Sequence, residues 1–171
     1  MTKSQKQPRA SGQVDFTLSN PVHFLALGFG SGLLRPAPGT WGTLAGALLL
    51  WVVGPWLGTQ TPVFFLMCLI MSGVGVYLCG QTARDVGVHD HGAIVWDEIV
   101  GLFITLAFVP YSLPALLIGF VLFRFFDIVK PWPIGWLDKK VHGGLGIMLD
   151  DIVAALYAGV LLYLIVRFEL I

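Results

Sequence analysis

Three charged residues recur at every third position of the aromatic segment FRFFDIVKPWP (123–133), namely Arg124, Asp127 and Lys130. On a helix with 3.6 residues per turn, this spacing places them on one face. Arginine binds phosphate oxygens as a bidentate fork, lysine binds them as a point charge, and a carboxylate binds a hard metal ion. The segment could therefore bind a phosphate group, or its charges could pair with one another at a membrane boundary.

Four further acids occur as two adjacent pairs at the edges of apolar runs. Asp97-Glu98 lies in VWDEIVG, and Asp150-Asp151 ends GGLGIMLDD. Together with Asp127 they make five carboxylates without clustered Cys or His, a set that suits Mg²⁺ joined to substrate phosphate. The alternative for each pair is capping of a helix, whose positive end a carboxylate complements. The sequence leaves both interpretations open for the second pair and favours a functional role for the first.

A glycine- and proline-rich motif, GSGLLRPAPGTWGT (30–43), precedes the first long apolar run. It contains Arg35, and the hydroxyls of Thr40 and Thr43 would lie with backbone N–H groups at a helix N-terminus, which attracts anions. The motif lacks the GxxxxGK[ST] pattern of a P-loop. It is therefore either a Pro/Gly turn or a phosphate-binding loop of another type.

The composition separates this chain from ordinary globular domains. Of its 171 residues, 56% are hydrophobic and 12% are charged, against roughly 45–50% and 25% in a typical domain. This imbalance indicates a membrane protein. The formal net charge of zero argues against nucleic-acid binding through a basic face.

The cysteines and histidines form no metal-ligand pattern. Cys68 and Cys79 lie in apolar sequence without a CxxC motif, so we expect both to be packing residues rather than disulfide partners or zinc ligands. His89, His91 and His142 lie in segments expected to be loops. His91 or His142 could act as a proton donor.

Three stretches contain no Asp, Glu, Lys or Arg, and they define the membrane part of the chain. Their apolar runs predict membrane-embedded helices at 43–57, 63–80, 99–109, 115–123 and 152–166. The expected fold is all-α, a multihelical integral membrane bundle with about four to five membrane-embedded helices. A shorter apolar segment, 22–34, lies at the surface or packs inside. Residues 1–20 are expected to form a polar cytoplasmic tail, and 21–171 a single helical domain.

The distribution of basic residues predicts the orientation. With the basic N-terminus inside, the connections GTQTP (58–62) and PYSLP (110–114) fall outside and carry no Lys or Arg, while the basic positions 35, 84, 130, 139 and 140 fall inside. All four polar motifs then reach the same inner boundary. There, charges stay partly hydrated, whereas a charge at the centre of a membrane helix costs about 2.5–3.5 kcal/mol.

Other classes of protein fit these features less well. The chain has no DxDx[TV], C-x5-R or PSGH pattern, which excludes three common types of phosphatase. A membrane transporter would usually place its charges near the midplane between inverted repeats, and the sequence contains no internal repeat. A membrane scaffold without hydrolytic activity would explain the helices but not the acids and bases gathered at one depth. Transport and scaffolding remain the alternatives.

Taken together, the motifs GSGLLRPAPGTWGT, VWDEIVG, FRFFDIVKPWPIGWLD and HGGLGIMLDD closely resemble the bacterial phosphatidylglycerophosphatase A family, over about 21–166. The resemblance implies a Mg²⁺-dependent, multi-pass enzyme of the bacterial inner membrane with its site on the cytoplasmic face. It would hydrolyse the lipid phosphatidylglycerophosphate to phosphatidylglycerol and inorganic phosphate in phospholipid synthesis. The implied partners are this substrate and the membrane lipids, and the oligomeric state is not predicted.

This resemblance also suggests a role for each charged residue. The expected catalytic residues are Asp97, Glu98, Asp127, Asp150 and Asp151. Of these, Asp97, Glu98 and Asp127 are the first-choice Mg²⁺ ligands, Asp150 is a further ligand, and Asp150 or Asp151 could be the base that activates water. The substrate phosphate would be held by Arg35, Thr40, Thr43, Arg124 and Lys130.

Overall fold

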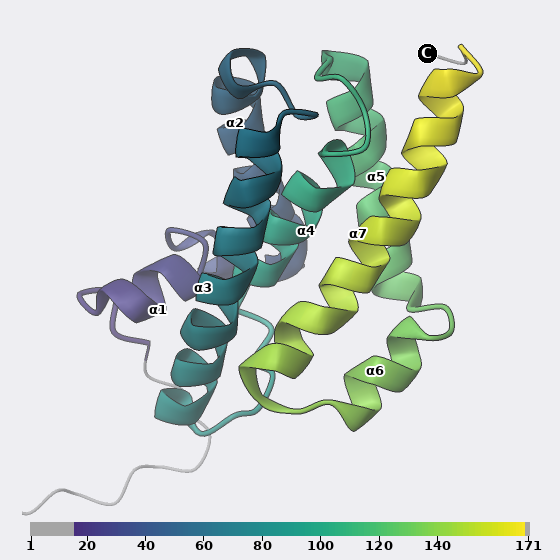
Figure 1. The fold of residues 1–171 in the computed structure, drawn as a ribbon. Coiled ribbons are helices and arrows are strands. Elements are labelled where there is room, and N and C mark those ends of the chain that lie inside the picture. Colours follow the sequence, from purple (N-terminus) through teal and green to yellow (C-terminus); the bar gives the residue numbers. More distant parts are fainter. Residues whose placement is uncertain (1–15, 170–171) are drawn as a thin grey trace, which may run out of the picture.

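The computed structural model describes residues 16–169, so residues 1–15 of the expected tail lie outside the described part. Its helices are α1 (Pro21–Ala26), the 3-10 helix η1 (Ser31–Leu33), α2 (Pro38–Leu57), α3 (Pro62–Val86), α4 (Trp96–Leu106), α5 (Leu113–Val129), α6 (Ile134–Lys140) and α7 (Gly143–Arg167). No strand occurs in this part of the chain. The predicted all-α fold is therefore confirmed (Figure 1).

Proline and short polar residues set where the helices begin. Proline occupies one of the first two positions of α1, α2, α3 and α5, where its missing N–H costs no hydrogen bond. The side chain of Thr61 accepts a hydrogen bond from the Phe64 N–H at the start of α3, and that of Ser112 does the same for Ala115 in α5. The connections expected between the apolar runs therefore lie where the sequence places them.

Three helices, α2, α3 and α7, are long and apolar enough to cross a membrane, with 20, 25 and 25 residues. They correspond to three of the predicted membrane helices. With 11 residues in α4 and 17 in α5, the other two are shorter than the about 20 residues of a simple span. A helical membrane-type bundle is thus supported, and the count of four to five stays a prediction.

The short helix α4 lies inside the bundle, where it packs against α2, α3, α5 and α7 (Figure 1). Nearly every one of its residues is buried, because neighbouring helices cover it on several sides. Its first turn carries Asp97 and Glu98. Because α4 begins within the bundle rather than at its rim, these acids are brought into the interior.

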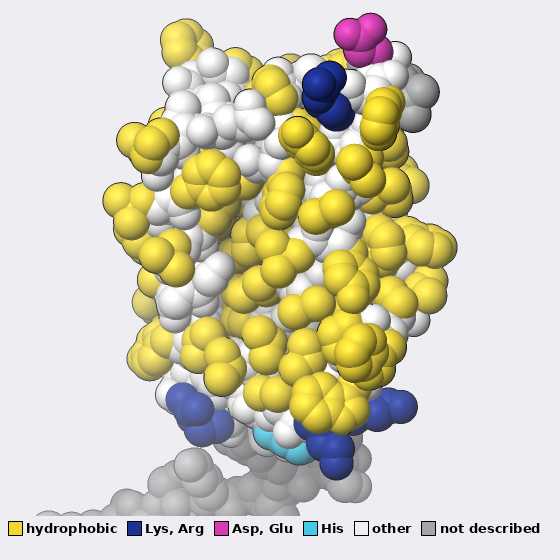
Figure 2. All heavy atoms as spheres, turned by 45° about the vertical axis from the view of Figure 1, so that its right-hand side comes forward, with side chains coloured by type: hydrophobic (Ala, Val, Ile, Leu, Met, Phe, Trp, Pro, Cys, Tyr) yellow, Lys and Arg dark blue, Asp and Glu magenta, His cyan; other side chains and the backbone are white. Residues whose placement is uncertain are grey.

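The surface is dominated by apolar side chains. Figure 2 shows them covering most of the height of the molecule, with Lys and Arg side chains gathered mainly at its lower rim. Trp56 is 88% exposed and Trp132 is 81% exposed. Such an extensive apolar surface is unfavourable in water and is typical of a protein that associates with membranes.

The connections between α2 and α3 and between α4 and α5 lie together at one end. The Thr59 hydroxyl donates to the carbonyl of Val109, and the Gln60 amide donates to that of Phe108. The predicted topology requires this arrangement, because the predicted orientation places both connections outside the membrane.

The apolar segment 22–34 forms α1 and η1. It was expected to lie at the surface or to pack inside, and it does both, since His23 and Leu27 are buried and Phe29 is exposed.

Glycines set the contact between α3 and α7. A Cβ on Gly144 would collide with the carbonyl oxygen of Val76, and one on Gly75 would meet Met148 and Trp96. The two backbones therefore approach closely at the start of α7. This contact fixes the rotation of α7 about its axis and so determines which of its side chains face α4.

Candidate functional site

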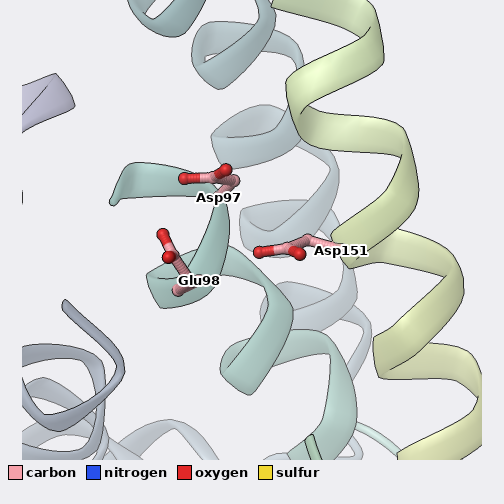
Figure 3. A group of neighbouring side chains, drawn as sticks. All are labelled: Asp97, Glu98 and Asp151. Carbon is pink, nitrogen blue, oxygen red and sulfur yellow. The ribbon is translucent and has the colours of Figure 1, made fainter. Parts of the chain in front are cut away.

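Three buried or nearly buried carboxylates converge between α4 and α7 (Figure 3). Asp97 and Glu98 come from the first turn of α4 and Asp151 comes from α7, and one oxygen from each lies within 4.8 Å of the others. Asp97 is 8% exposed and Asp151 is 3% exposed. Gathering negative charges away from water is strongly unfavourable without a compensating cation. We refer to these three residues as the acid cluster.

The acid cluster has unused ligand atoms. Asp97 Oδ1, Glu98 Oε2 and Asp151 Oδ2 are buried and have no hydrogen-bond partner among the described residues. Buried polar atoms are nearly always satisfied in native proteins, so an unpaired set invites a ligand. Hard oxygen donors of this kind fit a hard divalent cation. The acid cluster is therefore a candidate metal site.

Two hydrogen bonds from the residues just before the acid cluster hold the start of α4. The Val95 N–H donates to the carbonyl of Ala26, 2.8 Å away, and the indole N–H of Trp96 donates to that of Met71 at 3.1 Å. These bonds tie α4 to α1 and to α3. The two acids that follow are consequently presented by a rigid segment, which preorganises them.

Arg124 on α5 lies beside the acid cluster. Its Nη1 is 2.6 Å from Asp127 Oδ2 and 3.8 Å from Glu98 Oε1, and it also donates to Thr43 Oγ1 at 3.5 Å. The Thr43 hydroxyl in turn donates to the carbonyl of Gly39. Arg124 Nε is buried and has no hydrogen-bond partner among the described residues. A guanidinium with an unused donor beside a candidate metal site can donate to the oxygens of a phosphate group.

Lys130 differs from its predicted position on the helical face. Helix α5 ends at Val129, and Lys130 takes a left-handed conformation with φ of 44°, so only Arg124 and Asp127 form the expected pair along the helix. Its ammonium lies 2.6 Å from Asp150 Oδ2 and 2.9 Å from Asp138 Oδ1. Burial lowers the pKa of Lys130, but these hydrogen bonds outweigh it and hold the pKa above its usual value.

The backbone at the start of α2 completes the surroundings of the acid cluster. A Cβ built on Gly39 would collide with Glu98 Oε1 and would lie 3.1 Å from the guanidinium nitrogens of Arg124. Only a residue without a side chain lets the first turn of α2 approach the two charged groups. This turn is therefore part of the candidate site.

Gly39→Ala is expected to lower the activity of the protein by about tenfold or more, because the added methyl group displaces Glu98 and Arg124 and small misplacements of reacting groups are costly. The measurement is the rate of phosphate release by the purified variant. Gly73→Ala on α3 is the matched control, because a Cβ there meets nothing within 4 Å. Equal rates for the two variants would show that the first turn of α2 does not support the site.

The structure brings together only some of the predicted site residues. Asp97, Glu98 and Asp151 form the acid cluster, Arg124, Asp127 and Thr43 lie beside it, and Asp150 and Lys130 form an adjacent ion pair. Arg35 and Thr40 take part in none of these contacts. Arg35 is exposed and lines a separate cavity of about 680 Å³.

Sequence reasoning missed Asp138, the second carboxylate bound to Lys130. It lies on α6, a short helix that was not predicted, beyond Pro131 and Pro133. The two prolines end the helical periodicity that relates residues of α5. No pattern in the sequence therefore connects Asp138 with Lys130. Cys68 and Cys79 are buried, as expected of packing residues.

Comparison with known proteins agrees with these features. Residues 24–166 match the family described as Phosphatidylglycerophosphatase A. A Phosphatidylglycerophosphatase A of Haemophilus influenzae is 51% identical over 150 residues, which cover 87% of this chain and 91% of that protein. The protein of the same name from Escherichia coli (strain K12) is 51% identical over 149 residues, covering 86% and 85%. No solved structure matches the chain significantly.

Both relatives extend over nearly the whole described bundle, and the matched region contains every residue of the acid cluster. The resemblance suggested by the four motifs and the expectation of a phosphatase are thereby confirmed. This chain belongs to the phosphatidylglycerophosphatase A family.

Proposed function

We propose that this protein hydrolyses the phosphomonoester of phosphatidylglycerophosphate to give phosphatidylglycerol and inorganic phosphate, as a step of phospholipid synthesis. Family membership supports the substrate. The observation that carries the chemistry is the acid cluster, whose unpaired oxygens lie beside the guanidinium of Arg124. A cation site next to a phosphate-binding group is the arrangement that phosphate hydrolysis needs.

We propose Mg²⁺ as the metal and Asp97, Glu98 and Asp151 as its principal ligands. All three offer hard carboxylate oxygens, and Mg²⁺ sites commonly join a few carboxylates to substrate phosphate. When bound, the ion would supply Lewis-acid stabilisation of charge on the phosphate oxygens. Asp127 and Asp150, also predicted as ligands, are paired with Arg124 and Lys130, and we propose that neither is a principal metal ligand.

The residues of the chain have separate tasks in this proposal. Arg124 donates to the phosphate oxygens and offsets their growing charge as water attacks phosphorus. Asp150 accepts the proton of that water through Oδ1, which is buried and has no partner among the described residues, while Lys130 donates a hydrogen bond to Oδ2 and orients the carboxylate. The bond between phosphorus and the glycerol oxygen breaks, and the leaving oxygen takes a proton from solvent.

We further propose that the bundle sits in the bacterial inner membrane with its site at the cytoplasmic face. The positive-inside rule supports this orientation, because the basic residues lie at the helix ends opposite the connections at 58–61 and 107–112. Lys130 follows α5, and the last turns of α3 and α6 carry Arg84, Lys139 and Lys140. In this arrangement α4 and α5 enter the membrane together as a hairpin, which gives five embedded helices. The lipid tails would stay in the bilayer while the headgroup reaches the acid cluster.

Removal of the metal tests this proposal. Detergent-purified protein is expected to release phosphate from phosphatidylglycerophosphate with Mg²⁺, to stop in EDTA, and to recover when Mg²⁺ is restored. Its Tm is expected to rise with Mg²⁺ in the absence of substrate, because the ion neutralises a buried negative cluster. Folded protein that releases no phosphate with any divalent metal would overturn the proposal and leave transport or scaffolding as the alternatives.

A further inference from the structure

A cavity of about 680 Å³ lies beside the start of α2 and has no role in the mechanism above. Its walls are the loop before α2, the loop before α4 and the side chain of Phe16. Among the described residues that line it, Arg35 is the one with a permanent charge. Arg35 forms no ion pair with a described residue and is exposed, so its guanidinium is available to an anion.

The cavity and the acid cluster flank the same turn of helix. Pro38 lines the cavity, and the next residue, Gly39, lies against Glu98 and Arg124. Ala93 lines the cavity as well, and the chain reaches Asp97 within one short segment. A ligand that extends around the first turn of α2 can therefore occupy both places at once.

The loop that carries Arg35 is held in place. A Cβ on Gly32 would collide with the carbonyl oxygen of Ala93, so the two walls are in close contact there. The indole N–H of Trp41 donates to the carbonyl of Pro36 at 3.0 Å. Ala37 takes a left-handed conformation with φ of 60°, which a residue with a side chain adopts only when its surroundings impose it. The cavity is thus preformed.

The cavity has hydrogen-bond donors in its wall and exposed apolar side chains nearby, a combination that suits a lipid headgroup with its acyl chains. The Ala93 N–H donates to Nδ1 of His91, 3.1 Å away, so Nε2 is the ring nitrogen that can donate, and His91 is a second donor in the wall of the cavity. On the other side, Leu33, Leu34 and Trp41 expose 42%, 49% and 38% of their surface. Two donors for an anion therefore lie next to an apolar surface suited to acyl chains.

We propose that this cavity binds the bridging phosphodiester of the lipid substrate, with Arg35 as the group that recognises it. The inference rests on the proposed function, in which the phosphomonoester occupies the acid cluster. Phosphatidylglycerophosphate carries its second phosphate one glycerol unit away from the first, and Pro38 at the cavity is followed directly by Gly39 at the acid cluster. Arg35 then determines specificity for the lipid rather than taking part in phosphorus chemistry.

Steady-state kinetics of Arg35→Gln on phosphatidylglycerophosphate in mixed micelles tests this assignment. We expect KM to rise about tenfold, as for loss of a charge-assisted hydrogen bond, while kcat stays within about twofold because the reacting phosphate keeps its own ligands. His91→Ala is expected to raise KM by a smaller factor. Arg84→Gln is the matched control, since this arginine is exposed on α3, bonds to Gln81 and does not line the cavity.

Inhibition by inorganic phosphate provides the second measurement. Inorganic phosphate is the product released at the place where the phosphomonoester binds and should compete there first, so its inhibition constant is expected to be unchanged in Arg35→Gln. A fall in kcat at constant KM, or a phosphate inhibition constant that rises with KM, would assign Arg35 to the reacting phosphate and overturn the inference. Both measurements require that the unaltered protein hydrolyses the lipid. If it does not, the proposed function itself is rejected.

Discussion

Asp97→Asn is expected to lower the rate of phosphate release by about a thousandfold, among the largest effects of any single substitution in this protein. Asparagine keeps the shape of the side chain but removes one of the negative charges that make the acid cluster a cation site. The measurement is kcat/KM at saturating Mg²⁺. Asp90→Asn, on an exposed loop, is the control and is expected to retain the activity of the unaltered protein.

The same substitution should have the opposite effect on stability. Without metal, Asp97 and its neighbours repel one another in a buried site, so Asp97→Asn is expected to raise the Tm measured in EDTA, by about 2–4 °C for each kcal/mol of relieved repulsion. Mg²⁺ should then raise the Tm of the variant less than that of the unaltered protein. A variant that stays active, or whose Tm responds fully to Mg²⁺, would show that the metal binds elsewhere.

Arg124→Gln is expected to reduce both activity and stability. The guanidinium lies between Glu98 and Asp127, and all three side chains are at most 14% exposed. Removing the cation leaves two buried carboxylates uncompensated, which typically costs about 3–5 kcal/mol. Loss of a group that stabilises charge on phosphate should lower kcat by about a hundredfold or more. Phosphate release and thermal unfolding in detergent measure the two effects.

Two further variants separate these contributions. Arg124→Lys keeps the charge but not the planar fork, so the Tm should largely recover while kcat stays low. The double variant Arg124→Gln with Asp127→Asn removes both partners of the shortest ion pair at this place and should be more stable than Arg124→Gln alone. Activity near the unaltered level in Arg124→Lys would mean that the fork geometry is unimportant and that only charge matters.

The long helices were predictable because apolar side chains must cover the whole length of a membrane segment. The charge-free stretches therefore located α2, α3 and α7, and their connections contain the prolines and polar caps that begin helices. Apolar content located the third run at 99–109, whereas α4 runs from Trp96 to Leu106. The acids at the edge of that run, in the motif VWDEIVG, form the first turn of the helix.

The sequence could not predict which of the two adjacent acids Asp150 and Asp151 joins the acid cluster and which one binds Lys130. Adjacent residues on a helix point about 100° apart, so only one of Asp150 and Asp151 can face α4. The contact of Gly144 with α3 sets that rotation, and it selects Asp151 for the acid cluster and Asp150 for Lys130. Such a choice depends on tertiary packing between segments that are far apart in the chain.

The acid cluster draws its ligands from α4 and α7, which are separated by α5 and α6. During translation, a nascent chain that has emerged only as far as α6 carries Asp97, Glu98 and Arg124 but neither Asp150 nor Asp151. We expect such a chain to release no phosphate. Packing of α7 against α3 is then the step that completes the acid cluster in a growing polypeptide.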